Sequence, residues 1–130
     1  MRNPESERAA LQVTDDFMAG FNARDMKAHF DTFHFPHVRI ASGAVRVFAS
    51  REELEANPEQ YGRREVEKGW ARSAWDSREV IHAGADKVHL AVQFTRYGAD
   101  GRPINTYRAV YVITKLDDRW GIQCRSSFAP

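Results

Sequence analysis

The fold is decided by an alternating stretch in the second half of the chain, KVHLAVQFT at residues 87–95. Apolar residues recur there at every second position, and the residues between them are His, Ala, Gln and Thr. A period of two is typical of a strand that buries one face. We therefore expect four side chains of this strand to face the core: Val88, Leu90, Val92 and Phe94.

Similar segments lie on both sides of this strand and are rich in β-branched and aromatic residues, which favour strands. They lie near residues 73–83, 87–97, 104–116 and 120–128, and short segments with Gly and Asp separate them. Because short connections join antiparallel neighbours, the second half predicts a four-strand meander. Its third strand is apolar on both sides, with Val110 and Val112 on one and Tyr111 and Ile113 on the other. Such a strand is covered on both faces, and we expect a second copy of the chain on the face away from the helices.

The start of the chain predicts two helices. Asn3 is typical of an N-cap, and apolar residues with helical spacing continue to Phe21. Residues 22–24 break this helix, and Asp25 can cap a second, shorter one that ends at Pro36, because the residue before proline disfavours the α region. The apolar face of this second helix is expected to consist of Met26, Phe30 and Phe33.

The chain then becomes extended over residues 38–47. A Ser42-Gly43 turn inside this segment predicts a hairpin with two cross-strand pairs, Ile40 with Val45 and Val38 with Val47.

A helix is expected from the capping box of Ser50 and Glu53, and a further helix from Pro58 to a stop at Gly69. Helices grouped before a meander are typical of an α+β domain with helices packed on one face of a curved, mostly antiparallel sheet.

Composition excludes several classes of protein. The 130 residues carry a net charge of +1, which argues against a general nucleic-acid binder. No run approaches 18 apolar residues and the first residues lack an apolar leader, so we expect no membrane segment and no signal peptide. Cys124 is the single cysteine, which excludes an intrachain disulfide and fits a cytoplasmic location.

Two stretches resemble the nuclear transport factor 2-like superfamily. They are the helical opening FNARDMKAHF at residues 21–30 and the closing LDDRWGI at residues 116–122. The order of elements matches as well, and the chain is most similar to the SnoaL-like group, whose relatives include polyketide cyclases and ketosteroid isomerase. The resemblance implies one domain over residues 1–130 with a cystatin-like, cone-shaped fold, a deep apolar pocket and a homodimer.

The acid–base residues that this resemblance implies are missing. Ketosteroid-isomerase-like members use an acid at the end of the first strand, where this chain has residues 38–41 without Asp or Glu. The position of their phenol falls near Phe17, and that of their oxyanion-binding acid near Val112. Isomerase chemistry by those three groups is therefore not expected.

Two pairs of polar residues are candidates for catalysis. His34 and His37 flank Pro36, and an imidazole there could act as a base, whereas the alternative is a pair of partly exposed loop histidines. With His29 they could in principle hold zinc, but no acid or cysteine completes a familiar spacing, so we expect no metal. A two-residue turn at Asp117-Asp118 would place Arg108 diagonally from Arg125, where both could bind a carboxylate or phosphate.

That arginine pairing has an alternative. The same face could meet solvent or a partner, and a slip of one residue would separate Arg108 from Arg125 onto opposite faces. Aromatic residues are candidates for the pocket wall, or alternatively for the core or an interface: Phe17, Trp70, Trp75, Tyr107 and Tyr111. Cys124 is expected to be a buried small apolar residue.

Two functions remain open at this point. The first is a pocket protein that binds or transforms a small apolar or aromatic molecule, which could be anionic, without a cofactor. As an enzyme it would be an isomerase, lyase or cyclase with a histidine base and an arginine at the oxyanion. The second is a non-catalytic dimeric accessory module, which the missing acids favour.

Overall fold

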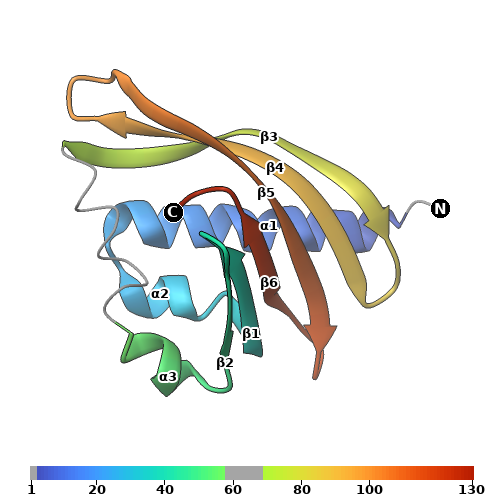
Figure 1. Ribbon diagram of the computed structural model, residues 1–130. Coiled ribbons are helices and arrows are strands. Elements are labelled where there is room, and N and C mark those ends of the chain that lie inside the picture. Colours follow the sequence, from blue (N-terminus) through green and yellow to red (C-terminus); the bar gives the residue numbers. More distant parts are fainter. Residues whose placement is uncertain (1–2, 58–68) are drawn as a thin grey trace.

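The computed structural model describes residues 3–57 and 69–130. Figure 1 shows helix α1 (Pro4–Ala23) lying along one face of a curved sheet, with the shorter helices near one end of it. The other elements are α2 (Met26–Phe30), β1 (Phe33–Ala41), β2 (Ala44–Phe48), α3 (Arg51–Glu55), β3 (Trp70–Ala83), β4 (Lys87–Gly98), β5 (Pro103–Leu116) and β6 (Arg119–Ser127). The helix expected from Pro58 lies outside the described residues.

The described strands form one sheet in the order β2-β1-β6-β5-β4-β3. Every neighbouring pair is antiparallel except β1 and β6, which run parallel. This confirms the predicted α+β fold, the meander of β3 to β6 and the hairpin, in which Ile40 pairs with Val45 and Val38 with Val47. No helix of the described chain is long and apolar enough to cross a bilayer.

The caps of α1 and α2 follow the sequence. The Asn3 side chain accepts a hydrogen bond from the backbone N–H of Ser6, and Arg24 ends α1 in the left-handed region. Asp25 then caps α2 by accepting from the N–H of Ala28 at 3.1 Å. The two helices approach closely at Gly20, where a Cβ would lie 2.8 Å from the backbone nitrogen of His29. The sharp turn between them therefore presses α2 against the last turn of α1.

The predicted end of the second helix is wrong. α2 ends at Phe30, and the Thr32 hydroxyl donates to the carbonyl of His29, which closes the helix. Phe33 pairs with Ile122 in the parallel ladder, so it belongs to β1 rather than to a helical face. Pro36 lies inside β1 instead of ending a helix.

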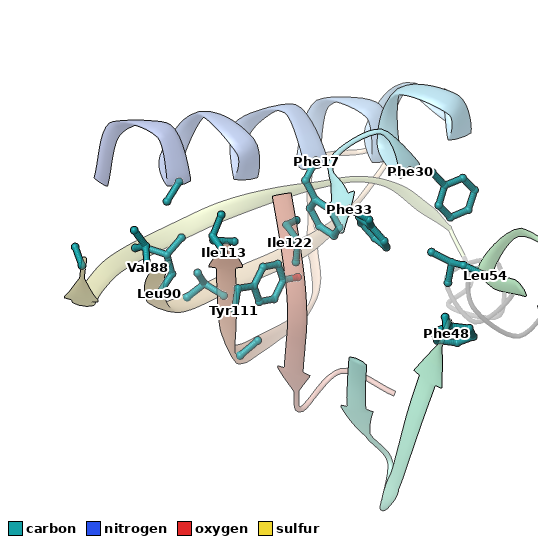
Figure 2. Packing of buried hydrophobic residues seen from close by; sticks show 14 residues of the cluster. Phe17, Phe30, Phe33, Phe48, Leu54, Val88, Leu90, Tyr111, Ile113 and Ile122 are labelled. Atoms are coloured by element: carbon teal, nitrogen blue, oxygen red, sulfur yellow. The ribbon is translucent and has the colours of Figure 1, made fainter. Parts of the chain in front are cut away.

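The alternating stretch of β4 buries its apolar set as predicted. Val88, Leu90, Val92 and Phe94 are all buried. Figure 2 shows the main cluster beneath α1, where Phe17, Ile113, Ile122 and Tyr111 meet side chains of β4. Phe30, Leu54 and Phe48 extend this cluster toward α3.

A β-bulge at Gln123 sets which side chains of β6 face the helix. The two-residue turn at Asp117-Asp118 forms as expected, because Leu116 pairs with Arg119. Ile113 pairs with Ile122 and Val112 with Cys124, so Gln123 is the extra residue on β6. Its amide nitrogen donates to the carbonyl of Pro36, and its oxygen accepts from Thr114 Oγ1 at 2.8 Å.

The bulge rules out the candidate pairing of Arg108 with Arg125 and gives the stated alternative, in which a slip of one residue separates the two side chains. Arg125 pairs with Tyr111 rather than with Val110, so it shares the face of the sheet that packs on α1. Arg108 lies on the opposite face and is exposed. A bulge shifts every later residue of its strand to the other face, and this separates the two guanidinium groups.

Candidate functional site

A buried arginine occupies the centre of the inner face, the face of the sheet that packs on α1. Arg125 is 7% exposed, and its Cζ lies 4.9 Å from the ring centroid of Phe33 and 5.7 Å from that of Phe17. A guanidinium over aromatic rings gains about 0.5–2 kcal/mol, which offsets only part of the cost of burying the charge. The site therefore holds a charge that its aromatic walls do not neutralise.

His37 orients this guanidinium. Arg125 Nε donates to His37 Nε2 at 3.0 Å, and because an arginine can only donate, that imidazole nitrogen is the acceptor. His37 Nδ1 therefore carries the proton and donates to the carbonyl of Ile122 at 3.1 Å. Burial, followed by the positive charges of Arg125 and Arg39, lowers the pKa of His37 to about 2. The ring stays neutral, with both nitrogens engaged inside the protein.

Another part of the Arg125 guanidinium has no partner. Within residues 3–57 and 69–130, no hydrogen-bond acceptor reaches the buried Nη2, and no carboxylate pairs with Arg125. An unsatisfied buried donor costs about 1–3 kcal/mol, and more when it is charged. A group that fits an open, charged Nη2 is a carboxylate oxygen, since a hydrogen bond between two charged groups is about twice as strong as a neutral one.

Tyr111 adds a neutral hydroxyl to the same face. It is buried, and burial raises the pKa of its phenol, while the positive charges of Arg125, Arg39 and Arg96 and a hydrogen bond with Arg125 act in the opposite direction. Its ring packs edge-on against the rings of Phe17 and Trp75, with 5.7 Å between the ring centroids in each pair. The inner face thus combines three guanidinium groups, one protonated phenol and an aromatic wall.

A family model described as NTF2-like protein (DUF6841) matches residues 6–125. The chain belongs to this NTF2-like family. The predicted resemblance is therefore confirmed, whereas no curated protein matches the chain.

Solved structures share the fold of this NTF2-like chain at low identity. Aln2 from a Streptomyces species superposes with a TM-score of 0.75 and 16% identity, over 98% of this chain and 93% of that one. A cystatin-like protein of unknown function from Nostoc punctiforme gives 0.73 and 12%, over 94% and 89%. A candidate ketosteroid isomerase from Shewanella frigidimarina gives 0.71 and 15%, over 92% and 94%. Identities this low show the fold alone.

Four of the predicted site residues of the NTF2-like chain come together: Phe17, His37, Tyr111 and Arg125. Tyr107 lies on the same face of β5 as Tyr111 and packs against Phe94, with the Arg96 guanidinium 5.0 Å from its ring centroid. Trp70 lies apart, against Phe21 at the end of α1, and its Nε1 donates to Ser73 Oγ at 3.0 Å. Arg108 is excluded by its position on the outer face.

His34, on β1, contacts Arg119 next to the turn between β5 and β6 and is not part of the Arg125 site. Arg119 Nη2 donates to His34 Nδ1 at 3.0 Å, so His34 Nε2 donates in turn to the carbonyl of Arg119 at 2.7 Å. Burial lowers the pKa of His34. Its ring fills the space at Gly121, where a Cβ would lie 2.8 Å from a ring carbon. The alternative of two exposed loop histidines is wrong, because His34 and His37 are buried in β1.

Sequence reasoning missed Arg39 and Arg96. Arg96 continues the apolar alternation of β4 by one more step after Phe94, so the period of two already placed it on the inner face. Arg39 pairs with Arg125 across the parallel ladder of β1 and β6, and its Nη2 donates to the carbonyls of Ala129 and Pro130 at 3.4 Å each. No local pattern announces a parallel pairing between distant strands, so Arg39 carried no sequence signal.

One concave feature of the described chain involves none of the predicted site residues. A groove of about 530 Å³ runs between α1, α2 and the start of β6. Val13, Gly20 and Trp120 are among its lining residues, and Asp16, Asp25 and Asp31 supply carboxylates. Asp25 caps α2 and Asp31 pairs with Lys27 and Arg51, so these two acids already have partners within the chain.

Buried neutral histidines make the folded state sensitive to acid. The pKa of His37 is about 2 when folded and about 6.5 when unfolded, so between these values the unfolded chain binds a proton that the folded chain does not. Stability is therefore expected to be complete above pH 6.5 and to fall below it, by up to about 1.4 kcal/mol per pH unit. Urea unfolding of His37→Gln at pH 6.5 and pH 5 should show about 1–2 kcal/mol less loss than wild type.

His34 acts in the same direction, because its pKa is lowered too, so His37→Gln should keep part of the acid sensitivity. The surface control is His82→Gln, whose loss of stability should stay much closer to that of wild type than the loss of His37→Gln, because His82 is exposed and acts only on the half-buried His89. Equal pH profiles for wild type and His37→Gln would contradict the assignment.

Proposed function

We propose that the chain binds a small aromatic or apolar molecule that carries a carboxylate, and that it does so without a cofactor. One observation carries the proposal, the buried guanidinium of Arg125 whose Nη2 has no partner among the described residues. Burying a charge without a partner costs free energy, and an anion bound beside the charge offsets that cost.

The surroundings of Arg125 support this class of ligand. Arg39 and Arg96 act on the same inner face with the same sign of charge, so an anion is favoured there and a cation is repelled. The protonated Tyr111 can donate a further hydrogen bond to an oxyanion. The guanidinium lies over the rings of Phe17 and Phe33, and these aromatic surroundings suit an apolar body attached to the carboxylate.

The geometry favours binding over general acid–base catalysis. His37 uses one nitrogen as acceptor from Arg125 and the other as donor to Ile122, so its role in the proposal is to position the guanidinium. His34 is engaged in the same way by Arg119. Arg125 and Tyr111 would stabilise an oxyanion, but the two histidines do not present a free nitrogen to a substrate proton.

The test is a panel of matched acids and amides. Benzoate and 2-naphthoate are titrated into the protein by calorimetry, alongside benzamide and 2-naphthamide. The acids are expected to bind and to raise the melting temperature, whereas the amides of the same shape should bind much more weakly. Equal behaviour of acids and amides would refute recognition through Arg125.

We further propose that two copies of the chain pair through the outer face of the sheet. Two adjacent cross-strand rows there are largely apolar, Val45-Ile40-Ser126-Val110-Ala91 and Val47-Val38-Cys124-Val112. Val45 is 67% exposed, Val47 60%, Ile40 41% and Val110 40%. The rows cross five of the strands, and an isologous dimer would remove them from water on both copies.

A charge in the middle of this apolar face should dissociate the dimer. Val110→Lys is expected to shift the protein from dimer to monomer in sedimentation velocity, because the ammonium would be buried against the partner copy. Leu116→Lys is the matched control, with a similar exposure of 43% at the end of β5. A wild-type monomer at micromolar concentration, or equal dissociation by both variants, would refute this interface.

We also propose a cytoplasmic location. Cys124 is the single cysteine of the sequence, and burial raises the pKa of its thiol. A single cysteine forms no intrachain disulfide, which suits a reducing compartment. Cys124 is half-buried on the outer face rather than buried as predicted, and its protonated thiol is a poor nucleophile and a poor metal ligand.

A further inference from the structure

Two histidines on the outer face of the sheet lie side by side. His82 on β3 and His89 on β4 are direct cross-strand partners, and their Nδ1 atoms are 3.1 Å apart. A bulge at Ile81 produces this pairing, because Val80 still pairs with Leu90 and the next aligned pair is His82 with His89. Bulges re-aim side chains, and this one brings two imidazoles onto the same face at the same level.

These two side chains are the accessible histidines of the chain. The sequence has five histidines, and His29, His34 and His37 are buried with their rings bonded to backbone carbonyls. His82 is exposed and His89 is half-buried, so solvent and solutes reach both rings. The pair lies next to the β3–β4 turn, well separated in Figure 1 from the α2 and α3 end of the molecule.

The spacing of the two nitrogens matches that of two ligands on one metal ion. Imidazole nitrogens bind late first-row metals at about 2.0–2.1 Å, so two of them at angles between 90° and 109° lie about 2.9–3.4 Å apart. We propose that His82 and His89 form a two-imidazole site for a divalent transition metal, with Cu²⁺ bound most tightly. Cu²⁺ is expected to have the highest affinity because the affinities of nitrogen sites for divalent first-row metals follow the Irving–Williams order.

The surroundings set the character of the site. In the metal-free chain one Nδ1 donates to the other, and when both Nδ1 atoms bind a metal ion the donor ring takes the tautomer that carries its proton on Nε2. Burial, followed by the charges of His82 and Lys87, lowers the pKa of His89, which keeps its ring in the neutral form that binds metals. Within residues 3–57 and 69–130, no group of three metal-binding side chains exists. The other coordination positions are therefore left to water or to an added small ligand.

The test is titration with copper chloride in a non-chelating buffer at pH 7.5. Wild type is expected to bind one Cu²⁺ per chain, with an electron paramagnetic resonance spectrum that shows coupling to two imidazole nitrogens. His82→Gln and His89→Gln should each weaken binding by at least about tenfold, since even an outer-shell partner of a metal ligand is worth about 10–100-fold. Each variant is expected to lose affinity for Ni²⁺ by a similar factor, and every form of the protein should bind Ni²⁺ more weakly than Cu²⁺.

Several controls keep the result interpretable. The double variant reports the background from the chain's amino terminus and other surface groups, and circular dichroism verifies that each variant is folded. Arg125→Met should bind copper as wild type does, whereas His82→Gln should bind 2-naphthoate as wild type does, so this site and the proposed function fail independently. Copper binding that is unchanged in the double variant, or a spectrum without two nitrogen ligands, would show that the two rings form only a hydrogen-bonded pair.

Discussion

Replacing Arg125 with Met should remove most of the affinity for aromatic carboxylates. The guanidinium supplies, through Nη2, the charge-assisted contact that the proposed ligand makes, and such a contact is worth about 2–3 kcal/mol, or about 30–150-fold in the dissociation constant. Isothermal titration with benzoate and 2-naphthoate measures this loss. Arg125→Lys should be intermediate, because it keeps the charge but not the planar pair of donors.

Stability should respond differently from binding. Met removes a buried charge that no described carboxylate balances, which offsets the loss of the hydrogen bond to His37. We expect the free energy of unfolding of Arg125→Met to stay within about 1 kcal/mol of wild type. Arg108→Met is the matched control, since Arg108 lies on the outer face and should affect neither property. Undiminished carboxylate binding by Arg125→Met would end the proposal.

Replacing Phe33 with Ala should give the largest loss of stability. Phe33 is 1% exposed, and its ring packs on those of Phe17 and His37 and beneath the Arg125 guanidinium. Removing a buried phenyl ring costs about 3–5 kcal/mol through lost transfer energy and the cavity left behind. Urea unfolding at pH 7.5 measures the change, away from the range in which the histidines titrate.

Phe128 provides the comparison for Phe33. It is 82% exposed, so Phe128→Ala should change stability by no more than about 0.5 kcal/mol. A loss below about 2 kcal/mol for Phe33→Ala would mean that neighbouring side chains relax into the space left by the ring. That outcome would contradict the close packing described around Arg125.

Local patterns predict most of the fold because they report one element at a time. The period of two places the core face of β4, and the caps at Asn3 and Asp25 place two helix starts. The spacing of Phe33 from Phe30 fits a helix, and the competing ladder partner Ile122 lies far away in the sequence. Pairing with the distant Ile122 therefore places Phe33 in a strand, although its local spacing fits a helix.

The site is less predictable because it depends on one inserted residue. His37, Tyr111, Phe17 and Arg125 can be found from chemistry alone, but the face that Arg125 shares is set by the bulge at Gln123. Nothing in the local sequence distinguishes a bulged glutamine from one in a regular ladder. A single extra residue therefore separates Arg125 from Arg108 and places Arg125 on the inner face among aromatic rings.

The position of β6 in the sheet has a consequence for the order of folding. β6 follows all other described strands in the sequence, yet it lies between β1 and β5 and is the sheet neighbour that joins the β1–β2 hairpin to the rest. During synthesis, the β1–β2 hairpin therefore lacks its neighbouring strand in the sheet until residues 119–127 have left the ribosome. Closing so long a loop makes assembly slow, and the valines of the waiting hairpin are then open to capture by a chaperone.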